Sequence, residues 1–210
     1  MAMELTHIRF AHDLKQVLHV QNESFYYAGA VYPDSRYITN IDRSLTHGGK
    51  SPNDPFTPGL SDFEKGWATH LFYDRKAHPQ YVPLSPWSME EAQQGNHVWQ
   101  FMSAVKIVED LQSYDVMNGK IGMILNISFP IYPSNEDPQT MQKYSDIQKT
   151  LYHVKPTLED YRIFWNNLSR ESGVIDSIME YAKNLLHNDM IQQKIKVIYP
   201  MVLDEILRIH

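Results

Sequence analysis

Three helix-start signals constrain the fold of this chain more than any other feature. The segments Ser61–Glu64 and Ser88–Glu91 both place a glutamate three residues after a serine, and Thr157 is followed in the same way by Asp160. In this arrangement each side chain accepts a hydrogen bond from the other residue's backbone N–H, which starts a helix. Apolar residues that recur every three or four positions extend the prediction. The predicted helices are His7–Glu23 capped by Thr6, Asp62–Lys76, one that begins at Ser88, breaks near Gly95 and resumes over His97–Tyr114, one from Thr157, Ser172–His187, and Ile191–His210 with a break before Pro200.

The rest of the chain gives little indication of β-structure. Residues 120–129 are rich in isoleucine and could be extended, but a single isolated segment cannot form a sheet. Glycines and prolines are frequent between Tyr26 and Asp62, which predicts that this stretch is mostly loop with a short helix around Thr39–Thr46.

These patterns predict an all-α fold, a single multi-helix domain over residues 1–210 with long loops. Residues 5–115 would hold the core of a functional site, and residues 116–210 would add a C-terminal loop and further helices. The chain has 210 residues, of which 42% are hydrophobic. A domain of this size buries about 70% of the surface that its unfolded chain exposes, so its core needs no disulfides.

Charge and cysteine content exclude several kinds of function. Lysine and arginine total 19 against 25 acidic residues, which gives a net charge of -6 and makes binding to nucleic acid or to an anionic membrane surface unexpected. The absence of cysteine excludes disulfides, thiolate zinc sites and cysteine nucleophiles. With ten histidines in the chain, any transition metal would be held by imidazole and carboxylate groups.

The sequence also bears on the location of the protein. The first residues do not resemble an export signal, because Glu4 and Arg9 are charged and no apolar run of sufficient length follows. The longest apolar stretch, residues 121–127, is far too short to cross a membrane. We therefore expect a soluble, cytoplasmic protein without a membrane span, and the sequence leaves its oligomeric state open.

One predicted helix carries a pair of side chains suited to binding a metal. His70 and Asp74 are four residues apart, so they lie on the same helix face at a distance of roughly 6 Å. Burying an imidazole and a carboxylate together is costly unless each has a partner. A simple hydrogen bond between the two would supply that partner, and so would a metal ion.

Three further segments carry potential ligands. Residues 29–34 form a turn that begins with the small residues Gly29 and Ala30 and ends in Pro33-Asp34, and His47 lies at the start of the loop formed by residues 48–59. His7 lies in the first turn of a predicted helix, where the helix dipole favours the neutral imidazole that a metal requires. Each also has a simpler interpretation: ordinary turn chemistry for Asp34, and a solvated surface histidine for His47 and His7.

Taken together, the four segments resemble the zinc-dependent phospholipase C family. The pattern of that family is an early Thr-His at the start of a helix, a Gly-x-x-x-Pro-Asp turn, a histidine, and a helix with His-x-x-x-Asp. The corresponding residues occur here in the same order: Thr6-His7, Gly29-Ala30-Val31-Tyr32-Pro33-Asp34, Thr46-His47 and His70-Leu71-Phe72-Tyr73-Asp74. The resemblance covers about residues 5–80.

The resemblance implies a fold of the phospholipase C/P1-nuclease-like type and a dinuclear metal site. Asp34, His47, His70 and Asp74 would bind one zinc ion, and Asp74 would bridge to a second ion that His7 contacts. Manganese or iron would also suit these ligands. Asp34 and Asp74 would be the catalytic carboxylates, and metal-activated water would hydrolyse a small-molecule or lipid phosphoester.

The sequence departs from the family where a third zinc ion would bind. His78 could serve as one ligand, but the expected His-x-x-x-Glu helix is missing because His97 is followed four residues later by Phe101.

On the helix predicted over His97–Tyr114, Lys106 and Asp110 have the spacing of an ion pair, and we expect them to form one on a solvated face.

Other functions remain open at this point. The protein could be a helical binding protein that keeps a structural metal site without turnover. It could belong to the wider His-Asp phosphohydrolases, although its adjacent pair His12-Asp13 lacks the rest of their pattern. It could also be a helical protein whose histidines are paired with carboxylates and bind no metal.

Overall fold

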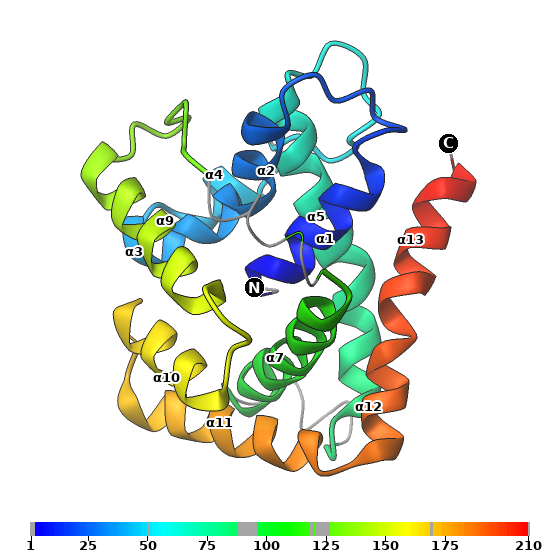
Figure 1. The fold of residues 1–210 in the computed structure, drawn as a ribbon, viewed down its shortest axis with the longest axis vertical. Coiled ribbons are helices and arrows are strands. Elements are labelled where there is room, and N and C mark those ends of the chain that lie inside the picture. Colours follow the sequence, from blue (N-terminus) through cyan, green and yellow to red (C-terminus); the bar gives the residue numbers. More distant parts are fainter. Residues whose placement is uncertain are drawn as a thin grey trace.

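A computed structural model describes residues 3–49, 51–87, 96–117, 120, 127–168 and 170–209. Within these ranges the chain is helical and has no strand, which confirms the predicted all-α class (Figure 1). In chain order the elements are α1 Glu4–Leu14, α2 Glu23–Val31, η1 Tyr32–Ser35, α3 Arg36–Thr39, α4 Arg43–His47, α5 Asp62–Tyr81, η2 Val82–Leu84, α7 Asn96–Met117, α9 Pro138–Tyr152, α10 Leu158–Asn167, α11 Ser172–Leu186, α12 Asp189–Lys196 and α13 Ile198–Ile209.

The N-terminal helices lie at the centre and the C-terminal helices surround them. Helix α1 packs against α2, α5 and α7, and α13 lies along α5 on one side of the molecule (Figure 1). Helix α11 crosses the end of the molecule against α7, while α9 and α10 lie on the side opposite α13. The segments that carry the predicted ligands are therefore inside the helical assembly, because other helices cover them.

The closest helix crossing joins α2 to α5 through two glycines. A Cβ atom on Gly29 would lie 1.9 Å from the backbone oxygen of Phe63, and a Cβ on Gly66 would lie 1.9 Å from that of Tyr26. Only glycine lets the two backbones approach this closely. The crossing holds the carbonyl of Ala30 against α5, where it meets the imidazole of His70.

The predicted helix starts at residues 61 and 157 are confirmed. Both capping boxes form: Ser61 caps α5, which extends past the predicted end to Tyr81, and Thr157 caps α10. The third signal, Ser88–Glu91, lies outside the described residues, as does most of the predicted extended segment. The C-terminal helical region is interrupted at Val197, between α12 and α13, before Pro200 as predicted.

The helix predictions near the N-terminus need correction. The first helix ends at Leu14 and not at Glu23, because the chain turns after it and His19 has a positive φ of 51°, which an α-helix does not contain. Thr6 is not its cap, since the helix begins at Glu4 and Thr6 lies inside it. The stretch after Tyr26, predicted as mostly loop, contains most of α2 and all of η1, α3 and α4, of which only α4 overlaps the short helix predicted around Thr39–Thr46 to a large extent.

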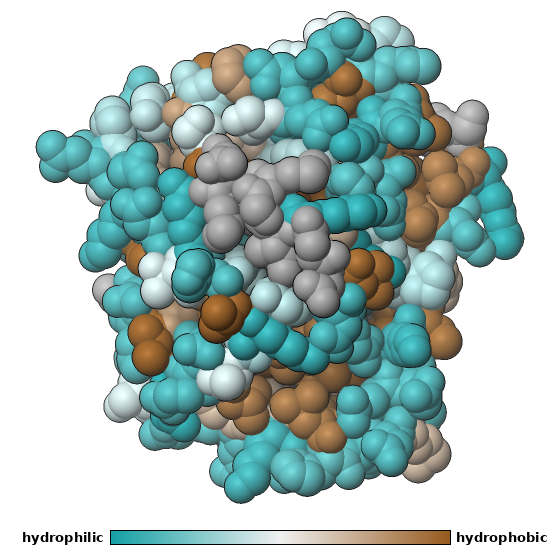
Figure 2. Space-filling view, viewed as in Figure 1, coloured by the Kyte–Doolittle hydropathy of each residue, from teal (hydrophilic) through white to brown (hydrophobic). Residues whose placement is uncertain are grey.

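The described residues that are visible on one face of the molecule are mainly polar. On the face shown in Figure 2, hydrophilic residues cover most of the area and hydrophobic residues form small separate groups. No helix among the described residues is both long and apolar enough to cross a membrane. The apolar stripes of the helices are mostly turned inward, where they form one connected core.

Candidate metal centre

The five side chains predicted to bind metal lie together in the interior. They come from α1 (His7), η1 (Asp34), the end of α4 (His47) and α5 (His70 and Asp74). Ligand atoms of His7, His70 and Asp74 lie within 4.8 Å of one another, and so do those of Asp34, His47 and His70. We call these five residues the ligand cluster. His70 belongs to both groups of three, so the cluster is continuous.

The distances from Asp74 to the three histidines of the ligand cluster suit shared coordination of a cation better than direct hydrogen bonds. Its Oδ1 lies 3.6 Å from Nε2 of His7, and its Oδ2 lies 3.9 Å from Nε2 of His47 and 3.8 Å from Nε2 of His70. These distances exceed those of a normal hydrogen bond. Two nitrogen or oxygen ligands on one zinc ion, each about 2.1 Å from it, are themselves separated by roughly 3 to 3.5 Å.

Two of the histidines are oriented by contacts on the far side of their rings. The Nδ1 of His70 donates to the carbonyl of Ala30 at 2.8 Å, which leaves Nε2 facing the cluster with its lone pair. The Nδ1 of His47 lies 2.8 Å from the hydroxyl of Thr46, which itself donates to the carbonyl of Arg43 and so accepts from the imidazole. Fixing the far nitrogen in this way is typical of metal-binding histidines.

Several buried atoms of the cluster have no hydrogen-bond partner among the described residues. They are both ring nitrogens of His7, both carboxylate oxygens of Asp34, and Nε2 of His70. The rings of His7 and His70 stack with centroids 3.7 Å apart, so neither ring can reach solvent from this face. Leaving such atoms unsatisfied is costly, and a divalent cation bound by imidazole and carboxylate would satisfy them. The donor set therefore fits a metal such as zinc.

Electrostatics keep the histidines in the form that binds metal. Burial lowers the pKa of His7 well below its ordinary value and also lowers the pKa of His70. Burial, together with repulsion from His70, lowers the pKa of His47 to about 3. All three imidazoles are therefore neutral at pH 7. Burial opposes ionisation of Asp74, yet nearby positive charge, including that of Lys106, and a hydrogen bond with His78 hold its pKa well below the usual range, so it is a carboxylate.

His78 joins the cluster from one turn further along α5. Its Nε2 lies 2.9 Å from Oδ1 of Asp74 and 2.6 Å from Nζ of Lys106, a lysine that is only 3% exposed. One ring nitrogen cannot donate to the carboxylate and accept from the ammonium at the same time. A third cation at His78 would lie against this ammonium and be repelled. The exposed His97, on α7, lies beside Trp87, with ring centroids 6.3 Å apart and the rings tilted by 32°.

The predicted surface ion pair on α7 is wrong. Lys106 and Asp110 are both buried, because α1, α5, α11 and α12 all pack against α7. Asp110 accepts hydrogen bonds from the backbone N–H of Thr6 at 2.9 Å and from the hydroxyls of Tyr152 and Tyr161 at 2.9 and 2.7 Å. Lys106 contacts His78, as described above.

A cavity of about 230 Å³ connects the ligand cluster to the surface. His47, Asp74 and His78 form its inner wall. The remaining lining residues are Arg43, Asn53, Leu71 and Arg75. Two ligand-cluster residues are thus reachable by a small molecule, and the outer wall carries two guanidinium groups.

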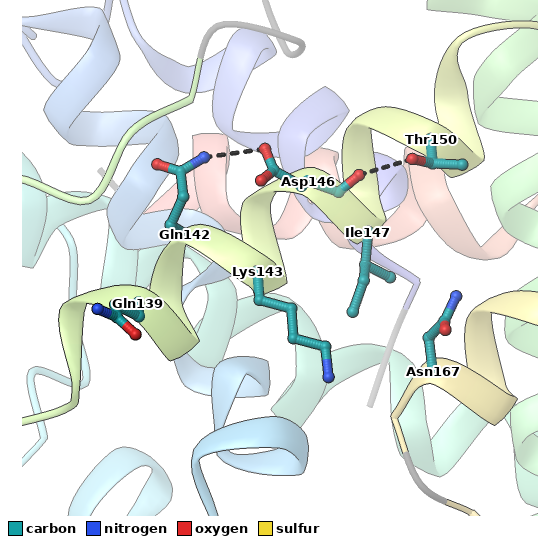
Figure 3. Close-up of a pocket in the computed structure, with 7 residues that line it drawn as sticks. All are labelled: Gln139, Gln142, Lys143, Asp146, Ile147, Thr150 and Asn167. Atoms are coloured by element: carbon teal, nitrogen blue, oxygen red, sulfur yellow. Dashed lines mark hydrogen bonds between the residues drawn. The ribbon is translucent and has the colours of Figure 1, made fainter.

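A larger hollow on the surface lacks these features. It has a volume of about 420 Å³ and lies between α9 and the end of α10 (Figure 3). Its lining contains no histidine, and its single carboxylate, Asp146, already accepts from Nε2 of Gln142 at 2.8 Å. The ligand cluster is therefore the stronger candidate for chemistry, although the hollow beside it is smaller.

Sequence reasoning did not find the residues that surround the ligand cluster. Thr46 was noted only as the neighbour of His47, and the role of Lys106 beside His78 depends on the packing of α7 against α5. The i, i+4 spacing of Arg43 and His47 could have indicated that Arg43 lies beside a predicted ligand.

No family model, curated protein or solved structure matches this chain.

Proposed function

We propose that this protein is a metal-dependent hydrolase of phosphoesters, similar in fold type and site to the zinc-dependent phospholipases C and P1-type nucleases. The observation that carries the proposal is the convergence of His7, Asp34, His47, His70 and Asp74 in the interior, where buried ligand atoms of His7, Asp34 and His70 have no hydrogen-bond partner among the described residues. The substrate would be a small-molecule or lipid phosphoester.

The residues fit two divalent cations, with zinc preferred and manganese or iron as alternatives. Bound there, such cations would lower the pKa of a water molecule and neutralise charge on a phosphoryl oxygen. The two overlapping groups of ligand atoms, which share His70, support two ions. Asp34 and Asp74 would be the functional carboxylates, because they are the two acidic residues among the five ligands.

The residues around the cavity are the groups that the chain itself would contribute to hydrolysis. Hydrolysis forms a bond between phosphorus and a water oxygen and breaks the bond between phosphorus and the alcohol oxygen, and a proton from the water ends on the alcohol. Asp74 and His47 line the cavity where the phosphoryl group would enter. The buried ammonium of Lys106, held against His78, adds a fixed positive charge behind Asp74.

The test combines metal analysis with a substrate panel. The purified protein would be assayed with an aryl phosphomonoester and an aryl phosphodiester, together with its Asp74→Asn variant and the control Asp146→Asn, an exposed carboxylate on α9. We expect Asp74→Asn to lose at least about half of the bound metal and to reduce hydrolysis about 100-fold or more, since carboxylate ligands of a catalytic ion are needed for both. The control should retain both.

Two outcomes would contradict the proposal. Full hydrolysis by Asp74→Asn would remove Asp74 from the mechanism. Bound metal without turnover on any substrate, with a melting temperature that drops sharply on chelation, would instead indicate a structural metal site.

A further inference from the structure

We propose that Arg43 and Arg75 form a recognition pair for a terminal phosphate group, so that the cavity beside the ligand cluster selects phosphomonoesters over phosphodiesters. This inference rests on the proposed function, because it names the substrate class of that same site. It is carried by the position of the two guanidinium groups in one small cavity with His47 and Asp74.

Helix α4 places Arg43 beside a ligand. Arg43 and His47 are four residues apart on this short helix, so they share one face. The helix is held in place at its end, where the carbonyl of Thr46 accepts a 2.7 Å hydrogen bond from Nε1 of Trp67 on α5. The same hydroxyl that orients His47 also bonds to the carbonyl of Arg43. The arginine and the ligand histidine are thus fixed to one rigid unit.

Helix α5 places Arg75 in the lining of the same cavity. It directly follows Asp74, and its Nη2 donates to the carbonyl of Asn53 at 3.2 Å. Its guanidinium carbon also lies 5.5 Å from the ring centroid of Phe72. These contacts order the side chain before any ligand binds, which reduces the entropy lost on binding. They also tie the loop formed by residues 48–59 to the cavity.

The charge of the cavity favours an anion. Within the described parts of the chain, neither Arg43 nor Arg75 has a carboxylate within ion-pair distance. The only carboxylate in the cavity wall is Asp74, which faces the ligand cluster. Arginine binds phosphate oxygens through two parallel N–H groups, so two arginines match a group with several free oxygens.

Size and charge together favour a monoester. A terminal phosphate carries a charge of about −1.5 to −2 at pH 7 and has three unsubstituted oxygens, whereas a diester has one charge and two such oxygens. The cavity volume of about 230 Å³ is below the roughly 300 to 1,000 Å³ of sites for drug-sized ligands. A phosphoryl group with a short part of its alcohol fits such a space better than a phosphate substituted on both sides.

The experiment measures phosphate binding and substrate preference in matched variants. Calorimetry with inorganic phosphate would compare the wild-type protein, the double variant Arg43→Gln/Arg75→Gln, and Arg208→Gln as a control for an exposed arginine on α13 far along the chain. We expect the double variant to weaken phosphate binding about tenfold or more, which is typical of losing hydrogen bonds to a charged group. Arg208→Gln should leave it unchanged.

Substrate kinetics give the second readout. The double variant should lower kcat/KM for an aryl phosphomonoester at least about tenfold more than for the matching diester, since only the monoester uses the additional oxygen and charge. The variant Arg43→Lys/Arg75→Lys keeps the charges but not the paired N–H groups, so its loss should be intermediate. Both arginines are exposed, and the far-ultraviolet circular dichroism of all variants should match that of the wild type.

The outcomes separate this inference from the proposed function. Equal phosphate affinity in the wild type and the double variant, or an unchanged preference between monoester and diester while hydrolysis continues, would overturn the arginine pair and leave the hydrolase intact. Phosphate binding that depends on the arginines in protein stripped of metal, without any hydrolysis after metal is restored, would support the pair and contradict the hydrolase.

Discussion

Two neighbouring groups of buried carboxylates are stabilised in different ways. On α7, Glu109 accepts from the hydroxyls of Tyr73 and Tyr81, each at 2.6 Å, and Asp110 accepts from Thr6, Tyr152 and Tyr161. We call Glu109 and Asp110 the tyrosine-bound pair. In the ligand cluster, by contrast, Asp34 and both nitrogens of His7 have no hydrogen bond from the described residues.

The two groups are in contact, so the difference is not one of depth in the protein. The ring of Tyr73 lies edge-on to that of His7, with centroids 5.6 Å apart, while its hydroxyl bonds to Glu109. The chain therefore supplies donors to Glu109 and Asp110, whereas none of the described residues donates to Asp34. Buried polar groups that a fold leaves unsatisfied are expected where a ligand completes them, because their burial otherwise only lowers stability.

The largest effect should follow from removing a carboxylate of the tyrosine-bound pair. Asp110→Ala leaves the N–H of Thr6 and the hydroxyls of Tyr152 and Tyr161 without their acceptor. We expect the free energy of unfolding to fall by about 3 to 5 kcal/mol in urea denaturation of metal-free protein. Asp110→Asn keeps one acceptor oxygen and should lose less. An alanine variant as stable as the wild type would show that these hydrogen bonds contribute nothing.

The next effect tests the helix crossing that places the ligand cluster. Gly29→Ala puts a methyl group against the backbone oxygen of Phe63 and must push α2 away from α5. We expect a loss of about 3 kcal/mol in stability together with weaker metal binding. The control is Gly173→Ala, where an added Cβ meets nothing within 4 Å. If the two substitutions have equal effects, close approach at Gly29 does not hold the site together.

A pH-dependent effect distinguishes the tyrosine-bound pair further. Burial raises the pKa of Glu109 to about 7, although its hydrogen bonds from Tyr73 and Tyr81 oppose the shift. The folded state therefore holds this proton more tightly than the unfolded state. The contribution of protonated Glu109 to the free energy of unfolding is full at low pH and is lost as the pH rises through about 7. The free energy of unfolding should therefore fall by on the order of 2 to 3 kcal/mol between about pH 5 and pH 8.

Glu109→Gln should flatten that dependence. The measurement is urea denaturation at several pH values in that window, and Glu159→Gln on the surface of α10 serves as the control. An identical pH profile for wild type and Glu109→Gln would mean that the carboxylate does not titrate in this range.

The smallest expected effect tests the contrast most sharply, because two similar substitutions should change the free energy of unfolding in opposite directions. His7→Phe removes two unsatisfied ring nitrogens and keeps an aromatic ring against His70. We expect metal-free protein to gain about 1 kcal/mol, whereas Tyr161→Phe, which removes a donor to Asp110, should lose about 1 kcal/mol. Thermal unfolding after chelation measures both. Destabilisation by His7→Phe in metal-free protein would argue that His7 has a structural role of its own.

The contrast also explains which parts of the molecule the sequence could predict. The capping boxes of α5 and α10 are local, so their residues predict them without any tertiary information. The hydrogen bonds that fix the start of α1 are not local. The N–H groups of Leu5 and Thr6 donate to Tyr152 and Asp110, which are more than a hundred residues away in the sequence. The neighbouring sequence therefore predicted the wrong cap, Thr6.

Helix α2 was missed for a related reason. Gly29 lowers helix propensity, and the sequence alone does not reveal that the close crossing with Gly66 requires it. Helix α9 was not predicted at all, although Asp137 caps it with Pro138 in its first turn. The convergence of the five ligands was predicted from the order of the motifs. The positions of Lys106, Arg43 and Arg75 beside the ligand cluster depend on how the helices pack. The i, i+4 spacing of Arg43 and His47 on α4 predicts that these two side chains share a face, but only the packing of the helices brings Arg75 into the same cavity and Lys106 against His78.

The metal content of the full-length protein, purified without chelators and measured by inductively coupled plasma mass spectrometry, tests the central claim most directly. We predict about two equivalents of zinc, manganese or iron per chain, as in dinuclear hydrolytic sites, and loss of both in His70→Ala, because His70 belongs to both groups of ligand atoms. Protein that contains no metal as purified, and takes up none when zinc, manganese or iron is added, would contradict the account.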